Sequence, residues 1–97
     1  VVREYRRRAE RAVPGRVARV VLYGSRARGE ARADSDWDVA VFLRGGATAR
    51  DLTVLADAAY DLIEDSGEFI QPVALPLEGT GAEAGFARRV RAEGIAV

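Results

Sequence analysis

The sequence predicts a small α/β (α+β) domain in which helices flank a small mixed sheet. Its 97 residues are 48% hydrophobic, which is enough for the core of one domain but not for two lobes around a large cleft. Short valine-rich runs alternate with longer segments in which apolar residues recur at helical spacing. Glycine or proline separates most of these segments. We therefore expect residues 1–97 to form a single domain.

Two strands are expected in the first half of the chain, after an opening helix. Apolar residues at helical spacing predict a helix that ends at Pro14-Gly15. Residues 17–23 are rich in valine and predict a buried strand. A polar connection over residues 24–35 leads to a second strand, predicted for residues 36–43, whose side chains alternate between two faces.

The second half is expected to begin with a long helix. Thr48 and Asp51 have the spacing of a capping box, and Ser66-Gly67 ends the helix that they begin. The apolar face predicted for this helix contains Leu52, Leu55, Ala59, Leu62 and Ile63.

An edge strand and a short helix are expected to follow. Residues 69–75 predict a third strand, and Pro72 within it indicates an edge position or a bulge, because proline donates no backbone hydrogen bond. Thr80 and Glu83 are the expected cap of the last helix, and residues 95–97 are expected to form a short strand or a tail. The predicted order is helix, strand, strand, helix, strand, helix.

Cysteine, histidine and methionine are absent, which limits the chemistry of any site. Their absence excludes disulfides, thiolate nucleophiles, zinc sites built from Cys and His, and histidine-based triads. Catalysis would depend on carboxylates, Arg, Ser, Thr or Tyr, and a bound metal would be a hard ion with oxygen ligands. No apolar run approaches the roughly 20 residues of a membrane span, and no signal-peptide core is visible, so a cytoplasmic location is expected.

The charge is divided unevenly along the chain although the net charge is zero. Residues 1–32 carry ten arginines against three acids, and residues 33–97 carry five arginines against twelve acids. The basic part is interpreted as a solvated helix face or, alternatively, as a patch for anionic partners such as phosphates. A nucleic-acid-binding module is the weaker hypothesis, because the basic part lacks interleaved aromatic residues and a known motif.

Two aspartates open the second predicted strand. Asp36 and Asp38 are two residues apart, so their side chains point to the same face of a strand. Two unpaired carboxylates at this spacing repel each other, and a divalent cation such as Mg²⁺, which prefers oxygen ligands, removes the conflict. A solvated strand end is the alternative, which the apolar strand directly after the pair disfavours.

Gly24-Ser25 stands at the end of the first predicted strand. Glycine there lets the backbone turn sharply and approach a ligand, and a helical turn that begins at Ser25 would offer amides to phosphate. Arg26 and Arg28 are candidates for charge-assisted contacts with the same phosphate, although arginines in such positions are often plain surface residues. An ordinary turn is the alternative for Gly-Ser alone, so the hypothesis depends on its combination with the aspartate pair.

This part of the chain combines two motifs, Gly24-Ser25-x-Ala27-Arg28-Gly29 and Ser35-Asp36-x-Asp38. Together they resemble the signature of the polymerase-beta-like nucleotidyltransferase superfamily. The similarity is greatest to its minimal nucleotidyltransferase (MNT) branch, which is often paired with HEPN-domain proteins in toxin–antitoxin modules. The motifs cover about a fifth of the chain, and the order of elements extends the resemblance over nearly all of it. The resemblance implies the polymerase-beta-like nucleotidyltransferase fold.

The same resemblance implies a nucleotidyl transfer assisted by two Mg²⁺ ions. Gly24 and Ser25 would hold the triphosphate with Arg28 as a helper, and Asp36 and Asp38 would bind the metal ions. An acceptor hydroxyl would attack the α-phosphorus in line, and pyrophosphate would leave. In the toxin–antitoxin relatives the nucleotide is ATP and the acceptor is a tyrosine of the partner protein. ATP and a HEPN-domain partner, or failing that a homodimer, are therefore expected here.

Gln71 stands where the family pattern has a third carboxylate, in the next predicted strand. Glutamine offers a carbonyl oxygen but no charge, and it cannot take a proton. Glu68 is the rival, although it lies three residues away and hence on the opposite face of a regular strand, unless Pro72 makes a bulge. Two functions follow as alternatives: an active nucleotidyltransferase, or a catalytically weak or inactive nucleotide-binding antitoxin module that acts by covering its partner.

Three aromatic side chains and one acid are assigned mainly structural roles. Trp37 lies between the two aspartates and is expected to pack into the core on the opposite face of the strand. Stacking on a base is the alternative, which the alternation disfavours because it points Trp37 away from the aspartates. Tyr23 and Tyr60 are expected in the core rather than as nucleophiles. Asp34 is interpreted as a turn residue or a loose outer ligand of the metal.

Overall fold

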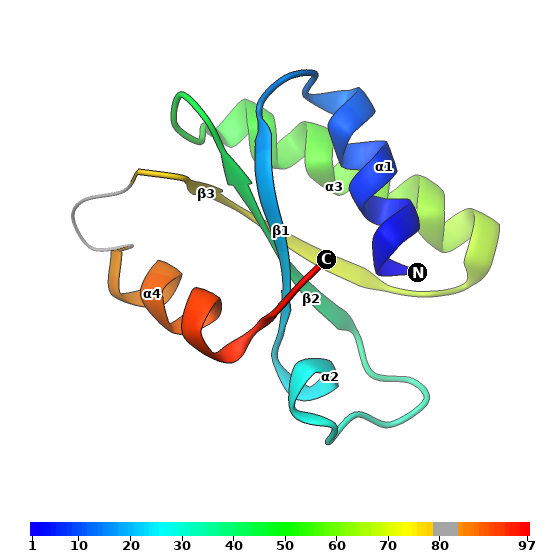
Figure 1. Cartoon of the computed structure of the whole chain (residues 1–97). Helices are drawn as coiled ribbons and strands as arrows, with labels where there is room; N and C mark the ends of the chain where they lie inside the picture. The colour runs from blue at the N-terminus through cyan, green and yellow to red at the C-terminus, as the bar shows by residue number, and fades with distance from the viewer. Residues whose placement is uncertain (79–83) are drawn as a thin grey trace.

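One mixed sheet with helices on both faces organises the chain (Figure 1). The computed structural model describes residues 1–78 and 84–97. Its elements are α1 (Val2–Ala12), β1 (Val17–Tyr23), α2 (Ser25–Arg28), β2 (Trp37–Leu43), α3 (Ala49–Ser66), β3 (Ile70–Pro76), α4 (Ala84–Glu93) and β4 (Ile95–Ala96).

The strands lie in the order β3-β2-β1-β4. β1 is antiparallel to both β2 and β4, whereas β2 and β3 run parallel and are connected through α3. The predicted small mixed sheet with flanking helices is thereby confirmed. The short helix α2 lies inside the polar connection between the first two strands, and the C-terminal residues do form a short strand.

The two faces of the sheet are covered by different helices (Figure 1). α1 and α3 pack on one face, where Val39, Val41 and Leu43 join the larger buried cluster. α4 packs on the other face, where Ala40 and Phe42 contact its buried residues. The alternation predicted for β2 is confirmed, and it places Asp38 on the face that α4 covers only in part.

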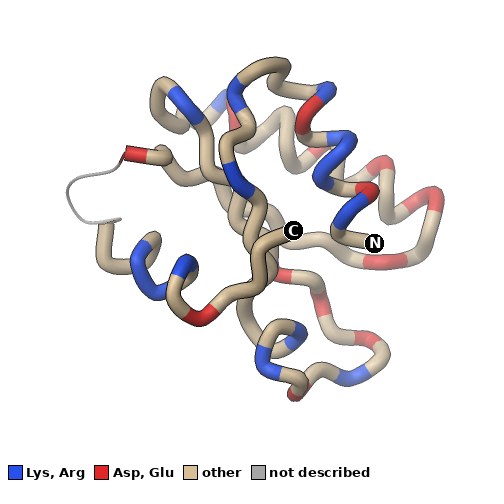
Figure 2. The backbone as a smooth tube through the Cα atoms, in the orientation of Figure 1, with Lys and Arg blue, Asp and Glu red and all other residues tan. Residues whose placement is uncertain are grey.

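The basic N-terminal part forms a solvated helix face with its own counter-charges. Figure 2 shows acidic positions interspersed among the arginines of α1. Arg6 pairs with Glu10 at 3.2 Å, and Arg7 and Arg8 each pair with Glu4 at 3.3 Å. Exposed pairs of this kind contribute little to stability, and they support the interpretation of this surface as a solvated face.

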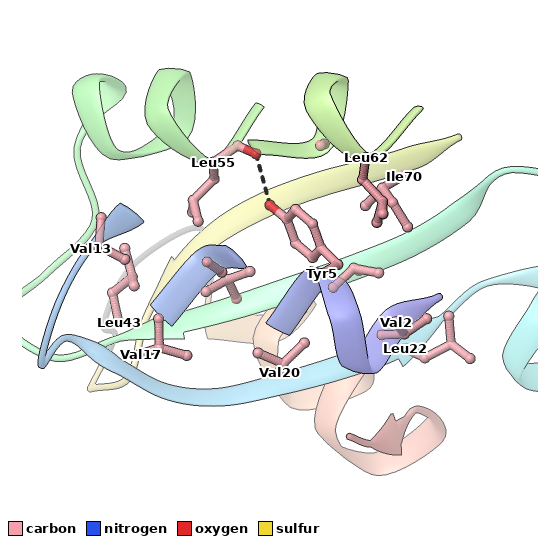
Figure 3. Packing of buried hydrophobic residues seen from close by; sticks show 14 residues of the cluster. Val2, Tyr5, Val13, Val17, Val20, Leu22, Leu43, Leu55, Leu62 and Ile70 are labelled. Atoms are coloured by element: carbon pink, nitrogen blue, oxygen red, sulfur yellow. Dashed lines mark hydrogen bonds between the residues drawn. The ribbon is translucent and has the colours of Figure 1, made fainter. Parts of the chain in front are cut away.

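Tyr5 joins α1 to α3 in the centre of the larger cluster (Figure 3). Its ring is fully buried, and its hydroxyl donates a hydrogen bond of 2.9 Å to the Leu55 carbonyl oxygen. The bond satisfies a polar group that would otherwise be costly to bury. Tyr5 therefore fixes how the two helices lie across the sheet.

An ion pair between half-buried Arg16 and buried Asp51 fixes the start of α3. Arg16 donates hydrogen bonds of 2.6 and 3.1 Å to the Asp51 carboxylate, whose residue is only 6% exposed. Asp51 also accepts from the Thr48 amide at 3.0 Å, and the Thr48 hydroxyl accepts from the Asp51 amide at 3.1 Å. The predicted capping box is confirmed.

Two expectations for α3 are wrong. Leu52 is 43% exposed, because Asp51 takes the inward position of the first turn to reach Arg16. Tyr60 is 60% exposed, because it lies one position beyond Ala59 and so outside the inward stripe of Leu55, Ala59 and Leu62.

β3 is an edge strand, as Pro72 predicted. Its pairing with β2 runs without interruption from Trp37 opposite Ile70 to Leu43 opposite Pro76, so Pro72 makes no bulge. Thr80 and Glu83, the expected cap of the last helix, lie outside the described residues. Within the described residues, no helix combines the length and the apolar character needed to cross a membrane.

Candidate functional site

Three side chains lie in one row across the end of the sheet. Asp38 on β2 is opposite Tyr23 on β1 and opposite Gln71 on β3. Residues in register on neighbouring strands point to the same face, so all three face the side of α4. Asp36 directly precedes β2, two residues before Asp38, and it is exposed. The structure thus places both carboxylates at one end of the sheet, but β2 begins one residue later than predicted, so only Asp38 lies within the strand.

Gly24 brings the connection after β1 into contact with Asp38. It has φ 75° and ψ −157°, a conformation that glycine adopts and other residues avoid. A Cβ added to Gly24 would lie 3.1 Å from the Asp38 carboxyl carbon and would overlap one of its oxygens. The site therefore needs glycine at this position for steric as well as conformational reasons.

The short helix α2 starts directly beside this contact. Ser25 is its first residue, and the amides of Ala27 and Arg28 donate to the Gly24 carbonyl oxygen at 3.1 and 3.2 Å. The helical turn expected after Gly24 is present. Ser25 directly follows Gly24, the residue that approaches the Asp38 carboxylate.

The electrostatic environment disfavours the charged form of Asp38. Partial burial raises the pKa of its carboxyl, and the neighbouring charge of Asp36 raises it further, while Arg28 acts in the opposite direction. Burial, and then Asp38, raise the pKa of Tyr23. Among the described residues, neither Asp36 nor Asp38 takes part in an ion pair. A cation bound between them would offset this repulsion.

Arg26 and Arg28 have different surroundings. The Arg26 guanidinium donates to the Ser35 carbonyl oxygen at 2.8 Å and lies 4.0 Å from the centre of the Trp37 ring. Its expected contact with phosphate is not supported, because it holds the loop that leads to Asp36 instead. Arg28 is exposed, pairs with Glu30 at 3.3 Å and acts electrostatically on Asp38.

Gln71 rather than Glu68 shares the face of Asp38. The indole N–H of Trp37 donates to the Glu68 carboxylate at 2.9 Å, and Trp37 packs against the cluster under α1 and α3, as expected. Glu68 is thus held on the face opposite to Asp38. In the part of the chain that the structure describes, no three acidic side chains gather in a manner suited to a metal ion.

The oxygen donors that remain fit a hard cation. Asp36 and Asp38 provide carboxylate oxygens, and Gln71 provides a neutral carbonyl oxygen from the adjacent strand. This donor set is the type that Mg²⁺ prefers, with one charge fewer than three carboxylates would supply. Asp34 instead lines a separate hollow beside Ser35 and Phe69.

A cavity of about 250 Å³ opens beside Gly24 and Arg28, and no local sequence pattern predicts it. Its other wall comes from α4, which contributes Phe86, Arg89 and Glu93. Tyr23 meets Phe86 edge to face, with 5.7 Å between the ring centres. The α4 residues are remote in sequence from both motifs, so only the docking of α4 on the sheet reveals them.

Solved structures with the same fold include two toxin–antitoxin structures and a proposed nucleotidyltransferase. A mutant of the toxin–antitoxin MntA–HpeT has a TM-score of 0.70 and 16% identity, over 97% of this chain and 69% of that chain. A proposed nucleotidyltransferase from Sulfolobus solfataricus has a TM-score of 0.66 and 18% identity, over 98% of this chain and 74% of that chain. A toxin–antitoxin with AMP-PNP has a TM-score of 0.67 and 16% identity, over 99% of this chain and 72% of that chain. At these identities the likeness shows the fold.

The sequence itself identifies the family. A comparison with curated proteins found no match. The family model described as the nucleotidyltransferase domain matches residues 2–75, which include α1, both motifs of the site and nearly all of β3. The chain therefore belongs to the nucleotidyltransferase domain family.

Proposed function

We propose that this domain transfers a nucleoside monophosphate group from Mg-ATP to a hydroxyl group of a partner protein. The observation that carries the proposal is the contact between Gly24 and the Asp38 carboxylate, with Asp36 two residues away and no ion pair to either acid within the described residues. This arrangement leaves two carboxylates that can hold a cation beside a backbone turn that can hold a phosphate. The family to which the chain belongs supports the same interpretation of the site.

Each residue of the site has a distinct role in this proposal. Asp36 and Asp38 hold Mg²⁺, and Gln71 offers a neutral oxygen from β3. Bound Mg²⁺ supplies charge neutralisation at the phosphate oxygens. Ser25, next to Gly24, holds the phosphates, and Arg28 adds a positive charge on the same side of the site.

The transfer replaces one bond to the α-phosphorus by another. The acceptor hydroxyl oxygen forms a bond to the α-phosphorus, the bond from that phosphorus to the bridging oxygen breaks, and diphosphate leaves. The hydroxyl proton passes to solvent water. Gln71 cannot accept it, since its amide has no basic group near neutral pH. The chain therefore has a nucleotide site with a weak provision for proton transfer.

A second candidate function follows from Gln71. Its position in register with Asp38 favours a catalytically weak or inactive module that binds a nucleotide and acts by covering its partner. This module and the active enzyme share the Mg-ATP site and differ in the rate of transfer. The transfer activity of variants that carry an acid at Gln71 separates the two.

The choice of ATP and of a protein partner is supported by the similar structures. One of them was solved with AMP-PNP, and two are toxin–antitoxin structures. We propose a HEPN-domain protein as the partner, with a homodimer as the alternative. Co-purification with the protein encoded next to it tests this. A strict monomer that is fully active on a small-molecule acceptor would contradict the proposal.

The binding site itself is tested by calorimetric titration of ATP. The wild type should bind ATP with Mg²⁺ and lose most affinity in EDTA. Asp36→Asn with Asp38→Asn should lower the affinity more than ~100-fold, because even residues that only support metal ligands contribute 10- to 100-fold.

A double variant of equal charge change serves as the control. Asp57→Asn with Asp61→Asn removes two acids from the groove between α1 and α3, on the opposite side of the sheet. It should bind Mg-ATP as the wild type does. Equal binding by the wild type in Mg²⁺ and in EDTA would remove the basis of the assignment.

A further inference from the structure

The cavity beside the nucleotide site has positive charge on two sides. Arg28 lines it from the end of α2, and Arg89 lines it from α4. Both side chains belong to exposed residues. Within residues 1–78 and 84–97, Arg89 takes part in no ion pair, whereas Arg28 pairs with exposed Glu30. Both arginines are thus placed to meet an anion that enters this cavity.

The cavity is large enough for part of a nucleotide but not for a whole one. Sites for drug-sized ligands enclose roughly 300–1,000 Å³. This cavity has about 250 Å³. Gly24 forms its boundary with the metal site, because the same residue lines the cavity and touches the Asp38 carboxylate. A ligand held at the aspartates can therefore extend past Gly24 into the cavity.

The charges indicate which part of the ligand enters. A nucleoside has no negative charge to match two arginines, whereas the terminal phosphates carry most of the charge of a nucleoside triphosphate. Arginine binds phosphate oxygens through two parallel N–H groups. Among the described residues that line the cavity, Glu93 is the one carboxylate. It lies one helical turn after Arg89, where it lowers the affinity for a polyphosphate without removing it.

We infer that Arg89 and Arg28 form a subsite for the β- and γ-phosphates of the nucleotide, which leave together as diphosphate. This inference rests on the proposed nucleotide site and adds Arg89 of α4 to it. Arg89 neutralises charge that accumulates on the diphosphate as its bond to the α-phosphorus breaks. α4 thereby becomes part of the binding site as well as a cover for the sheet.

Binding of two ligands to the 97-residue chain tests the subsite. The ligands are ATP and inorganic tripolyphosphate, both titrated calorimetrically with Mg²⁺. Arg89→Ala should weaken both by about 10- to 100-fold, the usual weight of a hydrogen bond between charged groups. Arg88→Ala is the matched control, because it removes the same charge from the same helix at a residue that does not line the cavity. It should change either affinity less than about threefold.

Glu93→Gln provides a change of opposite sign. It removes the carboxylate from the cavity and should strengthen tripolyphosphate binding severalfold. Thermal unfolding should be the same for all variants, since Arg88, Arg89 and Glu93 are exposed.

Two results for Arg89→Ala would overturn the inference. One is unchanged ATP binding, and the other is a loss for ATP without a loss for tripolyphosphate, which would assign the cavity to the nucleoside. Equal losses of affinity in Arg88→Ala and Arg89→Ala would show that only the overall charge of α4 matters, and this too would overturn the inference. If Arg89→Ala weakens both ligands while Asp36→Asn with Asp38→Asn does not, the subsite stands and the proposed metal site fails. A wild type that binds neither ligand would overturn both.

Discussion

Asp51 and Asp38 lie in opposite electrostatic environments within one small domain. Asp51 accepts two hydrogen bonds from Arg16 and one from the Thr48 amide. Arg16, and then Thr48, lower the pKa of its carboxyl from the ordinary 3.8 to about 2. Asp38 has Asp36 as its neighbour, and burial together with that charge raises the pKa of its carboxyl.

The difference separates a carboxylate that stabilises the fold from one that is available to a ligand. The charge of Asp51 is compensated within the chain, so it fixes the start of α3 and the packing of that helix. The charge of Asp38 is compensated only in part, by Arg28. Folding of the rest of the chain holds Asp38 in place despite the repulsion from Asp36. We expect a bound cation to compensate the charge of Asp38 and to have no effect on Asp51.

The largest expected effect comes from adding a third acid next to Asp38. Gln71→Asp or Gln71→Glu places a carboxylate in register with Asp38 on the edge strand. At least one of the two should raise nucleotidyl transfer by ~10²–10⁴-fold, the usual contribution of a general base. Single-turnover transfer from labelled ATP, with the co-purified partner as acceptor, measures the change.

Glu68→Gln is the control for this experiment. The Glu68 carboxylate accepts the Trp37 indole N–H on the opposite face, so its removal should leave transfer unchanged. Robust wild-type transfer that Glu68→Gln abolishes would show that Glu68 is the third acid after all.

Gly24→Ala should impair nucleotide binding, whereas a similar substitution away from the site should not. The new Cβ would displace the Asp38 carboxylate, and the affinity for Mg-ATP should fall about tenfold or more, which corresponds to 1.4 kcal/mol or more. Gly29→Ala is the matched control, because Gly29 also has a positive φ of 74° but no atom of residues 1–78 or 84–97 lies within 4 Å of an added Cβ. Gly29→Ala should lose about 1–2 kcal/mol of unfolding free energy from its left-handed backbone. Gly24→Ala should lose at least as much, because its φ of 75° and ψ of −157° lie in a region that is essentially restricted to glycine. Equal Mg-ATP affinities in the two variants would contradict the role of the Gly24–Asp38 contact.

Acid should remove the contribution of Asp51 to stability. Because its pKa is lowered on folding, this contribution is fully present above about pH 4 and is lost as the pH falls toward 2. Urea unfolding of the wild type over this range should show the decrease, and Asp51→Asn should be less stable at neutral pH with a flatter dependence. Asp57→Asn, at an exposed position of α3, is the control and should follow the wild type. If the free energy of unfolding of Asp51→Asn falls as steeply with pH as that of the wild type, the loss of stability comes from other carboxylates.

The smallest effect is expected from Asp38→Asn without Mg²⁺. Removing the charge relieves the repulsion from Asp36, so the free energy of unfolding should stay the same or rise slightly. Mg²⁺ should then raise the melting temperature of the wild type and not that of the variant. A clear destabilisation by Asp38→Asn would show that its carboxylate supports the fold in the manner of Asp51.

The sequence by itself determined the parts of the protein that depend on neighbouring residues. The period of the apolar residues located α1, β1 and β2, and the spacing of Thr48 and Asp51 located the start of α3. The alternation of side chains along a strand was enough to assign Asp38 and Val39 to opposite faces of the sheet. These features follow from local backbone geometry, which a short stretch of sequence specifies.

The tertiary structure decided which residues from distant segments meet. The register of β2 with β3 placed Gln71 rather than Glu68 beside Asp38. The docking of α4 brought Arg89 to the cavity that Arg28 lines. Local periodicity carries no information about such pairs, because strand register and helix docking depend on how the whole core packs. The choice of Asp51 over Leu52 as the inward residue of α3 has the same cause, since it needed Arg16 from the turn before β1.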